Sequence, residues 1–375
     1  MQRGRRLLAM AAVAVALPFS LPAVATAAAG PIELGVVPGT DDTWVTAIGD
    51  RGQLIGESCA NGPHSHSCVA AKWDKAGRVT ELKPLPGGFA AAKAVNASGV
   101  IVGASNVRAV LWSQDGSITQ LAAPPGGSTS EANGISSTGI VVGSGSTSDS
   151  RGRGLRWDSA GNVSVLAAPP LAGNYSATAI SRDGRFIAGQ LRGDDGSFRV
   201  LRWDATGAVT MLGPDSELSS FKELNASGEI VGRTTINDRY AAVKWTADGR
   251  MIELGWINSY ATDVLALNGS GVSAGSGYTD ATGTYAAVRW AADGTMTRLS
   301  AELEGSAEDI DARGRVVGAS AGKATLWDAN GVRTDLGTLP GGGFSRAQLI
   351  GLDGTIAGGA VTAGGDWHAV YWPAR

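Results

Sequence analysis

A tryptophan returns at nearly regular intervals along this chain of 375 residues. It ends a short apolar phrase of the type Ala-Val-Lys-Trp, and a glycine follows four residues later in every copy but the last. Successive copies lie 37 to 46 residues apart, and such a period indicates a repeat architecture. The eight copies are Trp73, Trp112, Trp157, Trp203, Trp245, Trp290, Trp327 and Trp372.

Each repeat contains four short apolar segments. The first ends in an apolar residue with a glycine four positions later, as in Val95 and Gly99. Small polar residues between the two, together with a glycine that accepts a positive φ, predict a tight hairpin. The second segment reads Ile-Val-Gly, as at 101–103, and the third is the tryptophan phrase. Apolar and polar residues alternate in that phrase, which is typical of a strand, and a fourth apolar segment follows a second glycine turn.

Four strands in a period of about 43 residues predict the blade of a β-propeller. The expected fold is therefore all-β, with eight four-stranded antiparallel blades in one domain over residues 30–375. The segment at 31–35 resembles a fourth strand without the preceding three, and Trp372 ends a third strand without a fourth. We therefore expect the N-terminal strand to complete the last blade and remove the free sheet edges.

The first 29 residues have the composition of a secretory signal peptide. Arg3, Arg5 and Arg6 precede an apolar run at 7–21, and small residues at 25–29 offer cleavage sites. The run is short for a membrane span, although an anchor or a buried helix is the alternative. The arginine pair also fits a twin-arginine export signal. We expect a secreted protein with no transmembrane segment in the mature chain.

The formal charge excludes some classes of partner. Removal of residues 1–29 takes away three arginines and no acid, so the net charge goes from −3 to −6. A negative chain does not favour nucleic acid or an anionic membrane surface, both of which prefer a basic face. No cofactor motif is present in the sequence, so none is expected.

The two cysteines, Cys59 and Cys68, lie nine residues apart around one loop. In an exported chain they predict a disulfide. The same loop holds His64 and His66, so a zinc site and free thiols are the alternatives, although the spacing is not that of a zinc finger. His368 is a further candidate ligand beside His64 and His66.

Several motifs near the C-terminus resemble those of the extracellular HAF-repeat family. They are Asp-Leu-Gly-Thr-Leu-Pro-Gly-Gly at 335–342, Ser-Arg-Ala at 345–347, Gly-Thr-Ile-Ala-Gly at 354–358 and His-Ala-Val-Tyr-Trp at 368–372. The last matches the His-Ala-Phe strand that gives the family its name, but the other copies lack the histidine. The resemblance implies a secreted, propeller-like repeat protein and carries no reaction or ligand. The spacings of Kelch and Asp-box propellers are not met.

Loop lengths point to one face of the ring. The stretch from the Ile-Val-Gly glycine to the tryptophan varies from 9 to 17 residues, and the loops between repeats vary as well. In a propeller these two loop classes lie on the same face, and variable loops on a rigid scaffold commonly bind ligands. Aromatic residues outside the repeat pattern fall on this face or its rim, where they could stack on sugar rings or anchor a peptide. They are Trp44, Trp256, Trp367, Tyr175, Tyr260, Tyr278 and Phe344.

Three functional classes remain from the sequence. A secreted, non-enzymatic module that binds an extracellular glycan or protein through the variable loops is the leading hypothesis. A propeller hydrolase or lyase is the alternative, and a pocket with converging carboxylates or histidines would favour it. A structural role in the cell envelope would predict a face without a pocket. Gly-Ala-Ser-Ala-Gly at 318–322 matches a nucleophile motif, but it occurs between two strands, so no catalytic residue is predicted.

Overall fold

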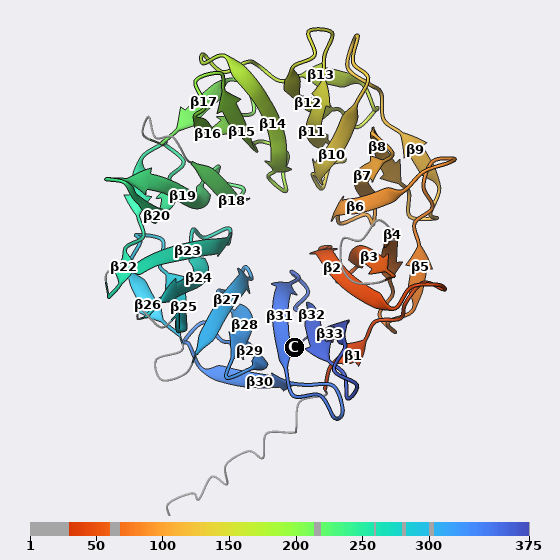
Figure 1. Cartoon of the computed structure of the whole chain (residues 1–375). Coiled ribbons are helices and arrows are strands. Elements are labelled where there is room, and N and C mark those ends of the chain that lie inside the picture. The colour runs from red at the N-terminus through yellow and green to blue at the C-terminus, as the bar shows by residue number, and fades with distance from the viewer. Residues whose placement is uncertain are drawn as a thin grey trace, which may run out of the picture.

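Eight antiparallel sheets form one closed ring in the computed structural model, which describes residues 30–60, 68–213, 219–258, 260–279, 283–299 and 304–374 (Figure 1). The expected all-β, eight-bladed propeller is confirmed. Within the described ranges there is no helix long and apolar enough to cross a membrane. The signal peptide expected at 1–29 lies outside the described residues.

The strands of each blade run from the centre of the ring to its rim. The inner strands are β2 (Asp42–Ile48), β6 (Ala90–Val95), β10 (Ser130–Ile135), β14 (Gly173–Ile180), β18 (Ser220–Leu224), β23 (Tyr260–Leu267), β27 (Gly305–Ile310) and β31 (Ser345–Ile350). The second strands are β3 (Leu54–Cys59), β7 (Ile101–Ser105), β11 (Val141–Ser146), β15 (Ile187–Gly193), β19 (Ile230–Ile236), β24 (Ser273–Tyr278), β28 (Val316–Ser320) and β32 (Ile356–Val361). The third strands are β4 (Cys68–Trp73), β8 (Arg108–Trp112), β12 (Gly152–Trp157), β16 (Phe198–Trp203), β20 (Arg239–Trp245), β25 (Tyr285–Trp290), β29 (Lys323–Trp327) and β33 (Trp367–Trp372). The outer strands are β5 (Val79–Glu81), β9 (Ile118–Gln120), β13 (Val163–Val165), β17 (Val209–Leu212), β21 (Met251–Glu253), β26 (Met296–Arg298), β30 (Arg333–Gly337) and β1 (Ile32–Glu33). Blade 6 also has a short strand, β22 (Trp256–Ile257), that pairs with the start of β23.

The N-terminal strand closes the ring, as expected. β1 pairs with β33, with Ile32 opposite Tyr371, so blade 8 has the order β1-β33-β32-β31. The Leu34 amide extends the pairing by donating to the Ala369 carbonyl at 3.0 Å. The His368 imidazole also contacts the Glu33 carboxylate. This histidine, considered above as a metal ligand, therefore joins the closing strand to its blade.

The glycines of the two hairpin turns have the conformation that the sequence predicts. All eight glycines after the inner strands have a positive φ, from 75° at Gly52 to 90° at Gly354. The seven glycines four residues after a repeat tryptophan also have a positive φ. A side chain would strain the backbone at these positions. The glycines therefore fix the conformation of each hairpin turn locally.

The repeat tryptophans are buried between blades and belong to the scaffold. In six blades the indole N–H donates to a carbonyl at the end of the preceding blade's outer strand, as from Trp290 to Leu254 at 2.6 Å. The indoles of Trp245 and Trp327 have no such partner among the described residues, and the neighbouring segments 214–218 and 300–303 are outside them. No function therefore needs to be assigned to these rings.

The residue before the repeat tryptophan forms a second link between neighbouring blades. In five blades it donates to the carbonyl two residues after the neighbouring tryptophan, as from Lys244 to Ala292 at 2.9 Å. Tyr371 makes the same contact with Lys75 across the closing seam. In blades 1, 4, 6 and 8 both contacts are present, so the third strand is hydrogen-bonded to both neighbouring blades.

Every inner strand contains a β-bulge, which the sequence reading missed. The register shifts at the same place in all eight blades, for example between Ala132 and Gly134. The Ile-Val-Gly glycine faces the bulge, and a Cβ on Gly143 would stand only 1.9 Å from the Glu131 carbonyl oxygen. The corresponding distance is 1.8 to 2.1 Å in every blade. The repeated glycine therefore makes room for the bulged backbone.

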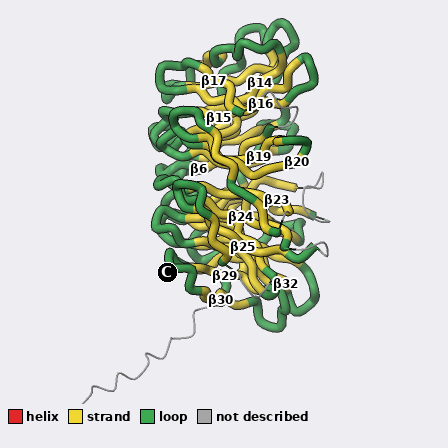
Figure 2. Tube along the Cα trace, turned by 90° about the vertical axis from the view of Figure 1, so that its left-hand side faces the viewer, coloured by secondary structure: helices red, strands yellow, loops and turns green. Residues whose placement is uncertain are grey.

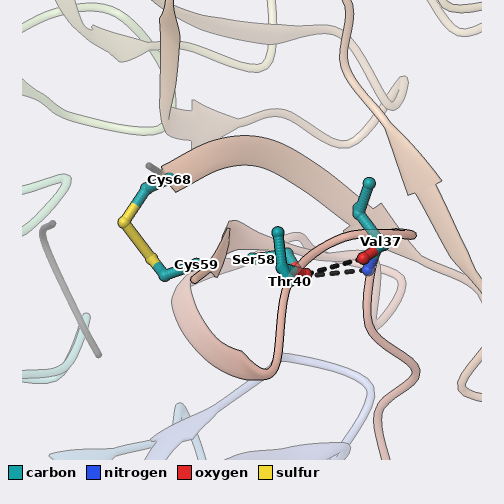
Figure 3. Close-up of a disulfide and its surroundings, with 5 residues drawn as sticks. All are labelled: Val37, Thr40, Ser58, Cys59 and Cys68. Atoms are coloured by element: carbon teal, nitrogen blue, oxygen red, sulfur yellow. Dashed lines mark hydrogen bonds between the residues drawn. A yellow bond between two sulfur atoms is a disulfide. The ribbon is translucent and has the colours of Figure 1, made fainter. Parts of the chain in front are cut away.

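The expected disulfide joins Cys59 and Cys68, which lie opposite each other at the ends of β3 and β4 (Figure 3). Beside it, Ser58 accepts a hydrogen bond from the Val37 amide at 3.0 Å and contacts Thr40. The bridge therefore closes the loop at 60–67 next to the chain segment that follows β1. His64 and His66 lie in the part of this loop, 61–67, that is outside the described residues.

Seen from the side, the strands lie between two layers of loops (Figure 2). We define the variable-loop face as the side where inner strands begin and second strands end. It carries the loops between blades and the loops between second and third strands.

Candidate functional site

A pocket of about 480 Å³ opens on the variable-loop face over blades 6, 7 and 8. It is lined by the middle of β23, the start of β27, the end of β28 and the first residues of β31. Its volume is in the range of small-molecule sites. Its polar and aromatic lining residues are Asp263, Ser276, Tyr285, Glu304, Ser306, Glu308, Ser320, Phe344 and Arg346.

Aromatic side chains come from two of the three blades. Tyr285 of blade 6 contacts the ring of Tyr278, with the centroids 4.2 Å apart, and the two hydroxyls are hydrogen-bonded. This hydrogen bond is the main reason that the pKa of Tyr285 is raised to about 12. Phe344 lies on the loop of blade 8 and is 41% exposed. Of these three residues, the sequence predicts Tyr278 and Phe344 and misses Tyr285.

A row of rings continues from the pocket into blade 1. Phe344 lies 5.9 Å from Trp367, and Trp367 lies 6.1 Å from Trp44 in a stacked arrangement. Trp367 also covers Gly359, where a Cβ would stand 2.1 Å from the indole. Three of the seven predicted aromatic residues are therefore brought together beside the pocket.

Tyr278 reaches the pocket wall through Tyr285, whereas the remaining three predicted aromatic residues lie away from the pocket. Trp256 is in β22, where Glu253 accepts its N–H at 2.5 Å and the Arg239 guanidinium lies 4.1 Å over its ring. Tyr260 follows in the same hairpin and is exposed. Tyr175 is only 5% exposed, and its hydroxyl donates to the Leu166 carbonyl in blade 3. Tyr175 thus packs between blades and offers little surface to a ligand.

Exposed aromatic rings gather on the variable-loop face. Among the described residues, each exposed Phe or Tyr lies at the start of an inner or third strand, or at the end of a second strand. These residues are Phe89, Tyr240, Tyr260, Tyr278, Tyr285 and Phe344.

The pocket contains three carboxylates that the sequence reading did not single out. Glu308 is ion-paired with Arg346, which also lines the pocket. Asp263 lies 3.7 Å from an Nη1 atom of Arg233. Glu304 is exposed, and within the described residues its carboxylate has no ion-pair partner. With Arg346 as the cation, the lining carries more negative than positive charge.

Three serines add hydrogen-bonding groups to the walls. Ser276 accepts the Ala307 amide at 3.2 Å, and Ser320 accepts a long bond from Arg333 at 3.4 Å. Ser320 belongs to the Gly-x-Ser-x-Gly motif, which spans the end of β28 and a two-residue turn to β29. That context is not the strand-to-helix elbow of a nucleophilic serine.

Metal binding has little support among the described residues. One group, Glu57 with Cys59 and Cys68, has its atoms close enough to hold an ion. The disulfide removes both thiolates from that group.

Two half-buried acids on the inner strands are a further finding. Glu223 and Asp309 both directly follow the bulge, where the other blades have Ala, Gly or Leu. Each accepts an amide from the next blade, Glu223 from Leu267 and Asp309 from Ile350 at 2.8 Å. Burial raises the pKa of Asp309 to about 7, and burial together with the nearby Asp309 raises the pKa of Glu223 to about 8. The sequence analysis did not single out this pair.

These raised pKa values predict that stability falls as pH rises. Between about pH 5 and pH 8 the folded protein binds protons that the unfolded chain has released, so the free energy of unfolding decreases with pH. We expect Glu223→Gln to flatten this dependence and to stabilise the protein by roughly 1–3 kcal/mol at pH 8. Denaturant midpoints at pH 5, 6, 7 and 8 measure the effect. The exposed Asp366→Asn is the control, and equal slopes for wild type and Glu223→Gln would contradict the prediction.

No family model matches the sequence, and no curated protein matches it either. Solved structures match the fold. Dipeptidyl peptidase 4 of Porphyromonas gingivalis is similar with a TM-score of 0.55 at 10% identity, over 80% of this chain and 52% of the peptidase. A puromycin hydrolase is similar with a TM-score of 0.50 at 12% identity, over 91% of this chain and 61% of that one. This chain thus spans about half the length of the peptidase, and at such identity the likeness shows the propeller fold alone.

Proposed function

We propose that this protein is an extracellular, non-enzymatic binding module that holds a glycan in the pocket over blades 6–8. The main support for this proposal is a pocket with aromatic and polar side chains in its walls, on the face where the exposed aromatic rings gather. A structural protein without a ligand would need no such pocket.

The chemistry of the lining fits a sugar better than a flat protein surface. Aromatic rings such as Phe344 and Tyr285 pack against the C–H faces of a sugar ring. Carboxylates and serine hydroxyls around them accept hydrogen bonds from sugar hydroxyls, and serines can also donate. A pocket of about 480 Å³ encloses one or two sugar units, whereas a stable protein interface buries about 800 Å² on each partner.

A hydrolase or lyase is the second candidate, because three carboxylates line the pocket. Glycoside hydrolysis commonly uses one carboxylic acid and one carboxylate with separate roles. Here Glu308 is paired with Arg346 and Asp263 lies near Arg233, which leaves Glu304 as the carboxylate without an ion-pair partner among the described residues. This arrangement supports binding more than acid–base catalysis.

The proposal includes export and membership of the HAF-repeat family. The Cys59–Cys68 disulfide fits an oxidising compartment, such as the cell exterior. The family motifs quoted above supply the second support.

A matched pair of aromatic substitutions tests the site. Phe344 directly precedes the inner strand of blade 8, and Phe89 directly precedes that of blade 2 but lies outside the pocket. We expect wild type to bind saccharides on a glycan array, and Phe344→Ala to weaken the best one about tenfold through loss of stacking. Phe89→Ala should bind like wild type.

Three results would overturn the proposal. If wild type binds no saccharide, the glycan is not the ligand. If Phe344→Ala and Phe89→Ala lose equal affinity, the pocket is not the binding site. Release of new sugar ends from the bound saccharide, lost in Glu304→Gln, would establish the enzyme instead.

A further inference from the structure

Glu304 belongs to blade 7, and the two neighbouring blades each contribute an aromatic residue to the same pocket. It ends the loop that enters blade 7, while Tyr285 begins a strand of blade 6 and Phe344 ends the loop that enters blade 8. All three side chains line the same pocket. A carboxylate that has no ion-pair partner among the described residues, in a pocket with aromatic side chains in its walls, suits an ammonium group.

One turn brings two of these residues together. The two-residue turn of blade 7, Ala321 and Gly322, receives both neighbours: the Ala321 amide donates to the Glu304 carbonyl at 3.0 Å, and the Phe344 ring lies over Gly322. A Cβ on Gly322 would stand 3.5 Å from that ring. The Ser345 amide also donates to the Gly322 carbonyl at 3.1 Å. The backbone therefore holds Glu304 and Phe344 on either side of a single turn.

The opposite wall is also preorganised. The Tyr285 hydroxyl is bound to that of Tyr278, so the ring has a fixed partner. Arg346, the cation that lines the pocket, is occupied by Glu308. A positively charged ligand group would therefore meet Glu304 and the negative faces of the rings without displacing an existing ion pair.

We infer that the saccharide recognised by this pocket carries a free, protonated amino group, as in a glucosamine unit. The inference rests on the proposed glycan function and adds the chemical class of the ligand. The ammonium group lies against the Glu304 carboxylate, and the sugar ring packs on Phe344 or Tyr285. A sugar with an N-acetyl group or a hydroxyl group in place of the amino group has no positive charge at that carbon.

Three tetrasaccharides that differ at one carbon test this inference with the full-length mature protein. They are the β-1,4-linked tetramers of glucosamine, N-acetylglucosamine and glucose, which offer an ammonium group, an amide and a hydroxyl. Titration calorimetry at pH 6 should show the glucosamine tetramer binding at least about tenfold more tightly than the other two. Glu304→Gln should reduce this preference to within about twofold. Phe344→Leu should weaken the glucosamine tetramer, because it removes an aromatic face.

A carboxylate at the equivalent place in another blade is the control. Asp41 directly precedes the inner strand of blade 1 and lies outside the pocket, so Asp41→Asn should keep the full preference. Equal affinity for the three tetramers, or an unchanged preference in Glu304→Gln, would overturn the amine inference while glycan binding stands. A protein that ignores all three tetramers but binds a tetralysine peptide in a Glu304-dependent manner would overturn the glycan itself.

Discussion

Replacement of Gly143 by alanine is expected to lower the apparent melting temperature by at least about 5 °C, which corresponds to roughly 3 kcal/mol or more. The added Cβ would stand 1.9 Å from the Glu131 carbonyl oxygen and 2.9 Å from its carbon. Both are backbone atoms, so no side-chain rotation relieves the overlap. The blade must either open the bulge of β10 or separate β10 from β11.

Gly152→Ala is the matched control in the same blade. A Cβ there meets its nearest atom, the Cβ of Asn174, at 3.6 Å, which is an ordinary contact. We expect a change of less than about 2 °C for this variant in the same thermal scan. A Gly143→Ala protein as stable as Gly152→Ala would show that the bulge does not need the glycine.

The second large effect is expected for Lys244→Met. The lysine side chain is 1% exposed, and its Nζ donates to the carbonyls of Gly271 at 3.0 Å and Ala292 at 2.9 Å. It also lies 2.9 Å from the Glu229 carboxylate. Methionine fills much of the same volume but removes the ammonium group from both carbonyls and leaves the Glu229 carboxylate without its cation, although the Asn225 side-chain amide still donates to it at 2.7 Å. We expect a loss of about 3 kcal/mol in denaturant unfolding.

Two further variants separate the charge from the shape. Lys72 occupies the same strand position in blade 1, but its bond to the Gln114 carbonyl at 3.1 Å is exposed, so Lys72→Met should cost less than about 1 kcal/mol. Adding Glu229→Gln to Lys244→Met should recover part of the lost stability, because no unpaired carboxylate remains. If the double variant is no more stable than the single one, the carboxylate is not the source of the loss.

The scaffold could be predicted from the sequence because its determinants are local. A glycine four residues after Val95 or after Trp112 is a property of a single turn, and its repetition gives the strand count. The closing strand followed from the same count, since a fourth strand at 31–35 had no partners of its own. These inferences needed no knowledge of which residues face each other across a sheet.

The bulges and the charged residues of the pocket could not be found in that way. A bulge depends on the register between two strands, and Gly143 lies opposite Ala132 only after pairing is known. Glu304, Tyr285 and Arg346 come from three consecutive blades, and only the packing of these blades against one another brings them to one pocket. A signal was present in one place: Glu223 and Asp309 break an otherwise apolar position, which an alignment of the inner strands would have shown.

Aromatic residues outside the repeat pattern were a partial guide to the position of the candidate pocket. The repeat pattern separates the eight tryptophans of the scaffold from the aromatic residues that do not repeat. Among the latter, Trp44, Trp367 and Phe344 form a row of rings beside the pocket. Sequence position could not tell these from Tyr175, because burial depends on the neighbouring blade. Tyr175 is covered by contacts with Leu166 and Trp203 that no local pattern reveals.

The closing strand also puts the repeats of the chain out of phase with the blades of the ring. Because β1 belongs to blade 8, a segment from one outer strand to the next third strand carries parts of two adjacent blades. If such a segment is lost or duplicated, the chain is interrupted only between a third strand and the outer strand that follows it. The N-terminal outer strand still pairs with the last third strand and closes the ring. The tryptophan of a new unit would find its carbonyl partner within its own unit, because each described pair joins an outer strand to the third strand that follows it in the chain. Such a chain can change its number of blades by whole units during evolution, while the seam stays the same.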